Sequence, residues 1–103
     1  MGYRRRFDII ADMLSVANGR AKKTKIMYQA NLSYKLLKKY LDEIRRSNLV
    51  TYERKGRCYA LTPKGEEFLK AYRQYSQHAV YLEKHLTHFR LEEKVLRKLC
   101  PEK

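Results

Sequence analysis

The sequence predicts a small, mostly α-helical protein with one β-hairpin and a long C-terminal helix. Three observations indicate this fold class. Apolar residues recur at helical spacing over residues 5–46, and the spacing changes to alternation over residues 49–61. Helical spacing then returns after Thr62 and continues to Pro101. A length of 103 residues suits one domain with an appendage.

The first helix is expected over roughly residues 5–18. Two adjacent apolar stripes run along it, which indicates packing on two sides. Asn18-Gly19 should end this helix, because glycine adopts the left-handed cap conformation without steric cost. The stripes consist of Phe7, Ile10, Leu14 and Ala17, and of Ile9, Met13 and Val16.

Residues 24–46 predict a short helix, a polar turn and a longer helix. Thr24 and Ser33 are expected to cap these two helices, since a hydroxyl accepts hydrogen bonds from free N–H groups of a first turn. The longer helix should bury Leu37, Leu41 and Ile44, flanked by Leu36 and Tyr40. Its other side carries Ser33, Lys35, Lys38, Lys39, Asp42, Arg45 and Arg46. An exposed basic helix preceded by a helix and a turn fits a DNA major groove.

A β-hairpin is expected next, with strands over residues 49–54 and 57–61 around a two-residue turn at Lys55-Gly56. One apolar face shared by both strands supports the register. The tip of this hairpin is basic. The register pairs Tyr52 with Tyr59, Val50 with Leu61 and Glu53 with Cys58.

The charge balance indicates a polyanionic partner. The chain has 24 Lys and Arg against 11 Asp and Glu, a formal charge of +13. Residues 1–62 hold 15 basic and 5 acidic residues, whereas residues 63–103 hold 9 and 6. Nucleic acid is the first candidate and an anionic membrane the second. Because no apolar run approaches the ~18 residues of a membrane span, we expect no membrane association and a cytoplasmic, nucleoid-associated protein.

The final helix, from Thr62-Pro63 to Pro101, would be a rod of ~55 Å. A heptad seam runs along it and predicts a partner helix. A parallel pair would place Glu93 against Glu93. An antiparallel pair about a two-fold axis near Lys84 matches large with small side chains, so we expect an antiparallel coiled-coil homodimer. Its contacts would be Leu82 with Leu86, Phe89 with Ala79, Tyr72 with Leu96, and Tyr75 with Glu93. The full seam is Phe68, Tyr72, Tyr75, Ala79, Leu82, Leu86, Phe89, Glu93, Leu96 and Cys100.

The remaining reactive side chains predict no enzyme, metal or cofactor. Cys58 and Cys100 are too far apart in sequence for a zinc motif and are expected to be reduced thiols. His78, His85 and His88 lie on the helix without an acid or cysteine at the spacing of a closed metal site. No nucleophile–base pair, acid pair or glycine-rich phosphate loop occurs.

Two segments carry a resemblance to a known family. Residues 24–50, TKIMYQANLSYKLLKKYLDEIRRSNLV, and residues 59–69, YALTPKGEEFL, resemble the archaeal winged-helix DNA-binding proteins of the ten-a chromatin group and related small archaeal transcriptional regulators. The resemblance implies a winged helix-turn-helix DNA-binding domain over residues 1–62 and a dimerisation helix over residues 63–103.

The same resemblance assigns residues to double-stranded DNA. A first group would face the major groove: Ser33, Tyr34, Lys35, Lys38 and Lys39. A second group on the hairpin would reach the adjacent backbone or minor groove: Arg54, Lys55 and Arg57. A third would hold phosphates: Lys22, Lys23, Lys25, Arg4, Arg5 and Arg6.

Three questions stay open at this stage. Lysines mostly bind phosphate and only Ser33, Arg54 or Arg57 suits a base edge, so a chromatin role and a sequence-specific regulatory role both fit. The side chain of Tyr34 fits a stacking or phosphate contact as well as a core position. A protein-interaction module that binds DNA only incidentally is the alternative of a different class.

Overall fold

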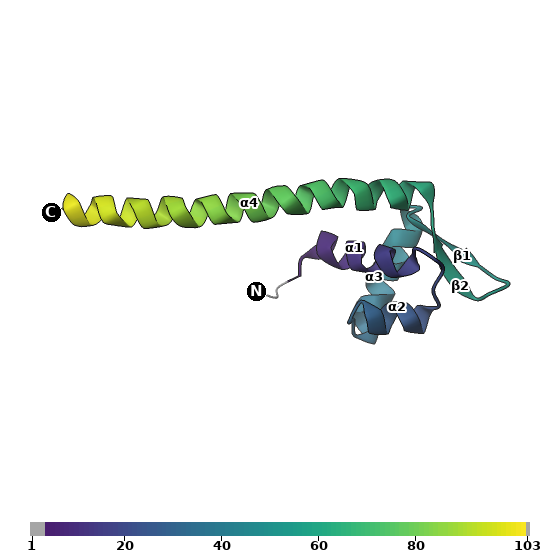
Figure 1. Cartoon of the computed structure of the whole chain (residues 1–103). Coiled ribbons are helices and arrows are strands. Elements are labelled where there is room, and N and C mark those ends of the chain that lie inside the picture. The colour runs from purple at the N-terminus through teal and green to yellow at the C-terminus, as the bar shows by residue number, and fades with distance from the viewer. Residues whose placement is uncertain (1–3, 103) are drawn as a thin grey trace. The chain divides into compact units, whose positions relative to one another are not determined.

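The computed structural model describes residues 4–102, which contain five helical or strand segments before one long final helix (Figure 1). The predicted helical fold with a two-stranded antiparallel hairpin and a long C-terminal helix is confirmed. The elements are α1 (Arg6–Ala17), α2 (Lys23–Gln29), α3 (Tyr34–Arg46), β1 (Val50–Glu53), β2 (Cys58–Leu61) and α4 (Pro63–Leu99).

The chain divides into two compact units, the first ending at Tyr72 and the second beginning at Arg73. Helix α4 contributes its first turns to the first unit and the rest to the second. The functional division into residues 1–62 and 63–103 stays a prediction. Residues 1–3 and 103 of those ranges lie outside the described part of the chain.

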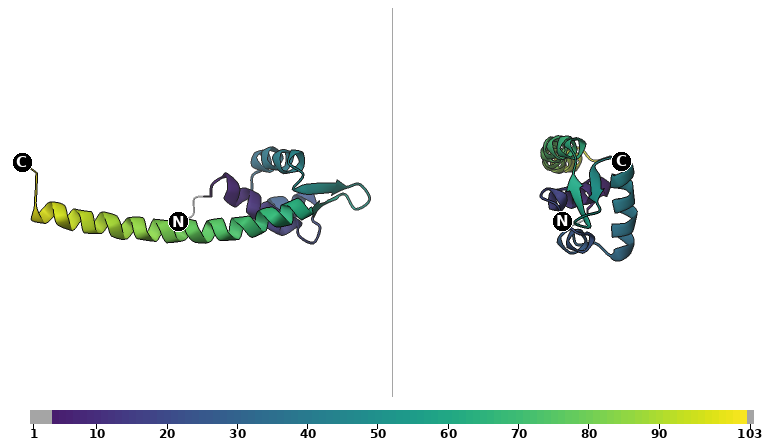
Figure 2. Two further views of the ribbon diagram at one scale, coloured as in Figure 1. Left: turned by 90° about the horizontal axis from the view of Figure 1, so that it is seen from above. Right: turned by 90° about the vertical axis from the view of Figure 1, so that its right-hand side faces the viewer.

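The core of the first unit lies among α1, α2, α3 and the hairpin. Figure 1 and the right view of Figure 2 show α3 oriented crosswise to α1. The predicted apolar stripes of α1 and α3 supply half of the core, and Tyr59 and Leu69 join it from β2 and α4. Its largest fully buried side chains are Met13, Leu14, Ile26, Leu37 and Ile44. Phe7, predicted for one stripe of α1, is exposed.

The cap predicted at Thr24 is wrong. Helix α2 begins at Lys23, with Lys22 as N-cap and no side-chain capping bond. The reason is tertiary: the Ala21 N–H donates to the Tyr59 carbonyl over 2.9 Å, and the Tyr59 N–H donates back over 2.7 Å. This backbone bridge holds the chain beside β2, so the helix starts directly after it.

The hairpin has the predicted register but a different turn. Val50 pairs with Leu61, Tyr52 with Tyr59, and Glu53 with Cys58. The strands end earlier than expected, so the loop has four residues, Arg54–Arg57, in place of two. Positive φ occurs at Arg57 (49°) and not at Gly56. A four-residue loop built on a tight turn explains this placement, because the left-handed residue comes at its end.

The start of α4 is tied to the segment after α3. The Gly65 N–H donates to the Thr62 hydroxyl oxygen over 3.0 Å, so Thr62 caps the helix. The same hydroxyl lies 2.7 Å from the Asn48 carbonyl and 3.1 Å from the Leu49 carbonyl, and the Lys64 ammonium donates to the Ser47 carbonyl over 2.8 Å. Carbonyl groups left free where α3 ends are thereby satisfied.

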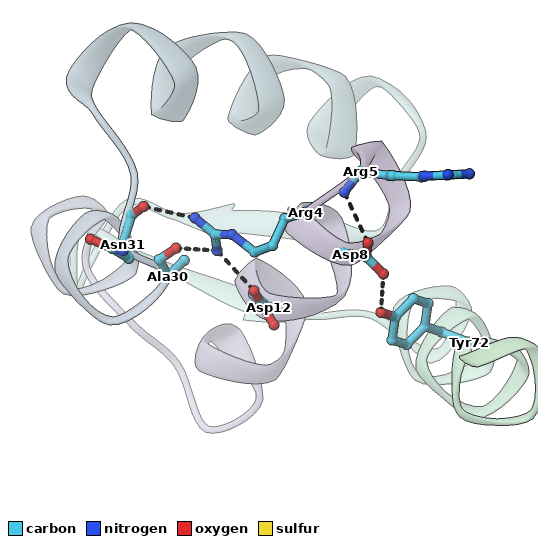
Figure 3. Close-up of polar contacts among 7 residues, drawn as sticks. All are labelled: Arg4, Arg5, Asp8, Asp12, Ala30, Asn31 and Tyr72. Atoms are coloured by element: carbon cyan, nitrogen blue, oxygen red, sulfur yellow. Dashed lines mark hydrogen bonds and ion pairs between the residues drawn. The ribbon is translucent and has the colours of Figure 1, made fainter. Parts of the chain in front are cut away.

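Two residues predicted for the coiled-coil seam pack inside the first unit. Phe68 forms an edge-to-face ring pair with Phe7 at a centroid distance of 6.1 Å. The Tyr72 hydroxyl donates to the Asp8 carboxylate, which also accepts from the Arg5 N–H over 2.9 Å (Figure 3). Both rings are partly buried against the core. The apolar row that stays exposed therefore begins at Tyr75.

The second unit consists of the remainder of α4 and the residues after it. Most of its apolar side chains are exposed: Tyr75 is 50% exposed, Leu82 67%, Phe89 59% and Leu96 65%. Glu93 pairs with Arg97 over 3.3 Å. Within residues 4–102, no helix combines the length and apolar character that membrane crossing requires.

We predict that Gly65→Ala destabilises the first unit, although alanine is normally the better helix former by about 1 kcal/mol. A Cβ atom at Gly65 would lie far inside contact distance of the Leu49 carbonyl oxygen and 2.5 Å from Leu61 Cδ1. The expected loss in the free energy of unfolding is about 1–3 kcal/mol, measured by urea unfolding. Lys70→Ala, on the exposed side of the same helix, is the control and should change it by less than about 0.5 kcal/mol. A stabilised Gly65→Ala protein would contradict the prediction.

We also predict that acid weakens the first unit partly through Asp8. The Tyr72 hydroxyl, followed by the Arg5 N–H, lowers the pKa of Asp8 in the folded protein. Its stabilising contribution is therefore complete above the unfolded-state pKa of about 4 and is lost as pH falls through the lower folded-state pKa. Tyr72→Phe removes the hydrogen bond that contributes most to the lowered pKa of Asp8. The free energy of unfolding of this variant should therefore fall less steeply than that of wild type as the pH is lowered from 5. Urea unfolding across this range tests the difference, and parallel curves would refute it.

Candidate nucleic-acid interface

Helix α3 separates a buried face from an exposed basic face. The Leu36 N–H donates to the Ser33 hydroxyl oxygen over 3.2 Å, so the predicted N-cap is confirmed. Leu37, Leu41 and Ile44 are buried as predicted, whereas Leu36 is 38% exposed and does not widen the buried stripe. Successive residues differ by about 100° around a helix, which turns Leu36 away from the core row. The exposed face carries Tyr34, Lys35, Lys38, Lys39, Asp42, Arg45 and Arg46.

Tyr34 lies on this exposed face and not in the core. Its side chain is 57% exposed, which decides the question that the sequence left open. The Lys23 ammonium lies 5.4 Å from the centre of its ring and the Lys38 ammonium 5.9 Å. Cations at these distances are attracted by the ring face. The tyrosine thus gathers one lysine from α2 and one from α3 around an exposed aromatic surface.

Among the described residues, Lys35, Lys38 and Lys39 of α3 have no acidic partner, whereas Arg46 at the end of the same helix pairs with Asp42. Within residues 4–102, the ion pairs join carboxylates to arginines: Asp12 to Arg4, Glu43 to Arg6, Glu53 to Arg20, Asp42 to Arg46 and Glu93 to Arg97. Lys35, Lys38 and Lys39 take part in none of these pairs. Their positive charge is therefore not compensated locally.

The hairpin loop presents a second basic group. Arg54, Lys55 and Arg57 are all exposed at its tip. Just below, Glu53 pairs with Arg20 over 3.2 Å and accepts a hydrogen bond from the Cys58 thiol over 3.6 Å. The base of the hairpin is thus partly neutralised, while its tip keeps its charge.

Arg45 connects α3 to the hairpin. Its guanidinium lies 5.6 Å from the ring centre of Tyr52 and 5.9 Å from that of Tyr59, whose rings are 5.0 Å apart. Stacking of an arginine over aromatic rings holds the end of α3 against the strands. The sequence placed Arg45 only on the exposed side of α3. Its role depends on a contact between two elements, which helical spacing does not reveal.

The N-terminal arginines are mostly engaged within the protein. The Arg4 guanidinium contacts Asp12 and the carbonyls of Ala30 and Asn31 (Figure 3). The Arg6 guanidinium pairs with Glu43 of α3, with Nε 2.6 Å from the carboxylate oxygen. The Arg5 side chain is exposed and extends away from Asp8. Of the three arginines predicted to hold phosphates, only Arg5 carries a charge without such a pairing.

The sequence also missed an exposed aromatic residue beside this region. Tyr28 in α2 is 77% exposed, although its neighbours Ile26 and Ala30 are buried. The sequence contained a signal for this exposure, because Tyr28 lies off the apolar row of α2. Lys22, the N-cap of α2, and Lys25 within α2 are exposed, and Lys23 is half-buried with its ammonium over the Tyr34 ring.

Comparison with known proteins agrees with this arrangement of elements. A family model described as winged helix-turn-helix matches residues 3–80. The chain belongs to the winged helix-turn-helix family. Helix α3 is therefore the recognition helix of the winged helix, and the hairpin of β1 and β2 is its wing.

A solved structure shows the same fold over nearly the whole chain. It is that of Sso10a-2, a DNA-binding protein from Sulfolobus solfataricus, with a TM-score of 0.69 and 21% sequence identity. The match covers 96% of this winged-helix chain and 100% of that chain. No curated protein sequence matches significantly. The winged-helix fold that the resemblance implied is thus confirmed.

The three histidines, His78, His85 and His88, are exposed on α4. Among the described residues, no three His, Cys, Asp or Glu side chains come together in an arrangement that would hold a metal ion. His85 instead packs against Tyr81, with ring centres 4.2 Å apart. Both cysteines are free thiols, Cys58 half-buried and Cys100 exposed.

Proposed function

We propose that this winged helix binds double-stranded DNA through the recognition helix and wing. The observation that carries the proposal is the exposed face of α3, where Lys35, Lys38 and Lys39 have no acidic partner within residues 4–102. A helix of this kind fits the major groove, and uncompensated ammonium groups attract phosphates. The similarity to a protein described as DNA-binding supports the proposal.

The proposed contacts fall into three groups. Lys22, Lys23, Lys25 and Arg5 would hold phosphates beside the recognition helix, and the wing would reach the neighbouring backbone or minor groove. Tyr34 would contact the sugar–phosphate backbone or stack, since its ring is exposed. The groove-facing group is Ser33, Tyr34, Lys35, Lys38 and Lys39, and the wing group is Arg54, Lys55 and Arg57.

We further propose that the second unit forms an antiparallel coiled coil with a second copy. Exposed apolar side chains in heptad register support this, because soluble helices rarely leave such a row uncovered. About a two-fold axis near Lys84, Leu82 would meet Leu86 of the partner subunit, Ala79 would meet Phe89 of the partner subunit, and Tyr75 would lie beside Glu93 of the partner subunit. The predicted seam residues Phe68 and Tyr72 already pack on α1, so we leave them out of the proposed interface.

A dimer with two lysine-rich faces suits an architectural role in chromatin. Lysine–phosphate contacts carry little sequence information, and two copies in one particle would bind two DNA segments. A sequence-specific regulatory role is the second candidate. It is favoured by the two exposed arginines of the wing, because an arginine can recognise guanine with two hydrogen bonds. Retention of random and genomic DNA fragments, followed by sequencing, separates the two roles.

We predict that Lys38→Glu combined with Lys39→Glu weakens duplex binding by at least about tenfold at low salt. The slope of log affinity against log salt should also become less steep by about 2, since two phosphate contacts are lost. Fluorescence anisotropy with a labelled duplex measures both quantities. Lys84→Glu combined with Lys94→Glu makes the same charge change on exposed positions off the seam and should retain most of the affinity.

Two results would reject the DNA proposal. One is wild-type protein that does not bind duplex DNA at low salt, and the other is binding that salt does not affect. Either result would favour the protein-interaction alternative, in which the wing and the helix of the second unit recruit other proteins.

The direction of the coiled coil is tested by disulfide crosslinking in a Cys58→Ser, Cys100→Ser background. Leu82→Cys and Leu86→Cys proteins, once mixed and re-equilibrated, should give mainly the mixed-site crosslink, because an antiparallel pair apposes these two positions. Val80→Cys, which is exposed off the seam, is the control and should crosslink poorly. Efficient same-site crosslinks without the mixed product would indicate a parallel pair.

A further inference from the structure

The Arg4 side chain is bound to acceptor groups of the protein itself, whereas a DNA-binding arginine leaves its guanidinium free for DNA. Its Nη1 group lies 2.9 Å from the Asp12 carboxylate and 2.6 Å from the Ala30 carbonyl, and its Nη2 group lies 2.8 Å from the Asn31 carbonyl (Figure 3). The side chain is only 32% exposed. One guanidinium thus joins α1 to the turn that follows α2.

The two carbonyls belong to the end of α2, where backbone acceptors lack helical partners. Ala30 is the C-cap of this helix, and Asn31 has a left-handed backbone with φ of 54°. A cation at a helix C-terminus is also favoured by the helix dipole. Since α2 has only seven residues, it gains little stability from its own hydrogen bonds. The turn therefore depends on contacts from outside the helix.

The segment that Arg4 holds determines where the recognition helix begins. Only Leu32 separates Asn31 from Ser33, the N-cap of α3. Leu32 is itself buried, and its N–H donates to the Met27 carbonyl over 2.9 Å. A shift at Asn31 would therefore move Ser33, where α3 begins, and with it Lys35 in the first turn of α3. Small displacements of contacting groups are costly when several of them must meet a rigid duplex.

We propose that Arg4 is a positioning residue for DNA binding, which fixes the turn before the recognition helix and makes no phosphate contact itself. The inference rests on the proposed DNA binding. The planar guanidinium is suited to this task because it directs several N–H donors at separate acceptors, whereas a lysine ammonium acts as a point charge. Asp12 keeps the guanidinium in place by pairing with its Nη1 group.

The test compares Arg4→Ala, Arg4→Lys and Asp12→Asn with wild type and with Arg5→Ala. Arg5→Ala removes the same charge from the adjacent, exposed side chain. The first measurement is amide hydrogen exchange over residues 30–37. The second is duplex affinity as a function of salt, by the anisotropy assay described above. Circular dichroism checks that each variant is folded.

Arg4→Ala should exchange about tenfold faster in this segment and bind duplex about tenfold more weakly, with the salt slope unchanged. Asp12→Asn should also weaken duplex binding, although the loss of a negative charge would by itself strengthen the attraction to DNA. Arg4→Lys should fall between wild type and Arg4→Ala. Arg5→Ala should leave the exchange over residues 30–37 unchanged. If Arg4→Ala does not fold, Asp12→Asn and Arg4→Lys decide the question.

Different results would overturn the assignment. If Arg4 bound phosphate, Arg4→Ala would flatten the salt slope by about 1, and Asp12→Asn would tighten binding because it frees the guanidinium. Unchanged exchange over residues 30–37 in Arg4→Ala would also overturn it. If wild-type protein does not bind duplex DNA, the proposed function fails, whereas faster exchange would still support the role of Arg4 in holding the turn.

Discussion

The close approach of α4 to the segment after α3 is the constraint on which the first unit depends. Gly65 leaves room for the Leu49 carbonyl oxygen, and the Thr62 hydroxyl bonds the carbonyls of Asn48 and Leu49. These contacts fix where α3 ends and where β1 begins. Since β1 determines the register of the wing, the position of the basic loop follows from the same contact. Arg45 then stacks on Tyr52 and Tyr59 and joins α3 directly to the wing.

The basic residues of the first unit have two tasks. Some arginines hold the structure together, as in the pairs of Arg4 with Asp12, Arg6 with Glu43, and Arg20 with Glu53. Among the described residues, the lysines of α3 and the wing residues Arg54 and Arg57 form no such pair. A guanidinium suits the first task because it makes several directed hydrogen bonds at once. Net charge alone therefore overestimates the number of groups available to a polyanion, since part of it serves the fold.

Regular patterns in the sequence predicted most of the fold, whereas local geometry depended on contacts that sequence spacing does not contain. The buried row of Leu37, Leu41 and Ile44 followed from helical spacing because apolar burial dominates the choice of face. The start of α2 did not, because a bridge between Ala21 and Tyr59 displaced it. The hairpin register followed from a shared apolar face, but the turn was longer than its glycine suggested.

The candidate site was predictable to a similar extent. Exposure of Lys35, Lys38 and Lys39 follows from the same helical spacing that buries their neighbours. The pairing of Arg6 with Glu43 joins residues 37 positions apart, and that of Arg4 with Asn31 joins residues 27 apart. No periodicity links such positions, so their proximity emerges only when α1 packs on α2 and α3.

A recognition face made of lysines also has a kinetic consequence. An ammonium has three rotatable donors and no preferred plane, so it passes from one phosphate to the next with little reorientation. When a lysine moves from one phosphate to the next, it displaces a counterion from the new phosphate while another counterion returns to the phosphate that it left. A protein held in this way would diffuse along the duplex between contacts. In a dimer, one copy would keep the duplex within reach while the other moves, so that relocation would not require full dissociation.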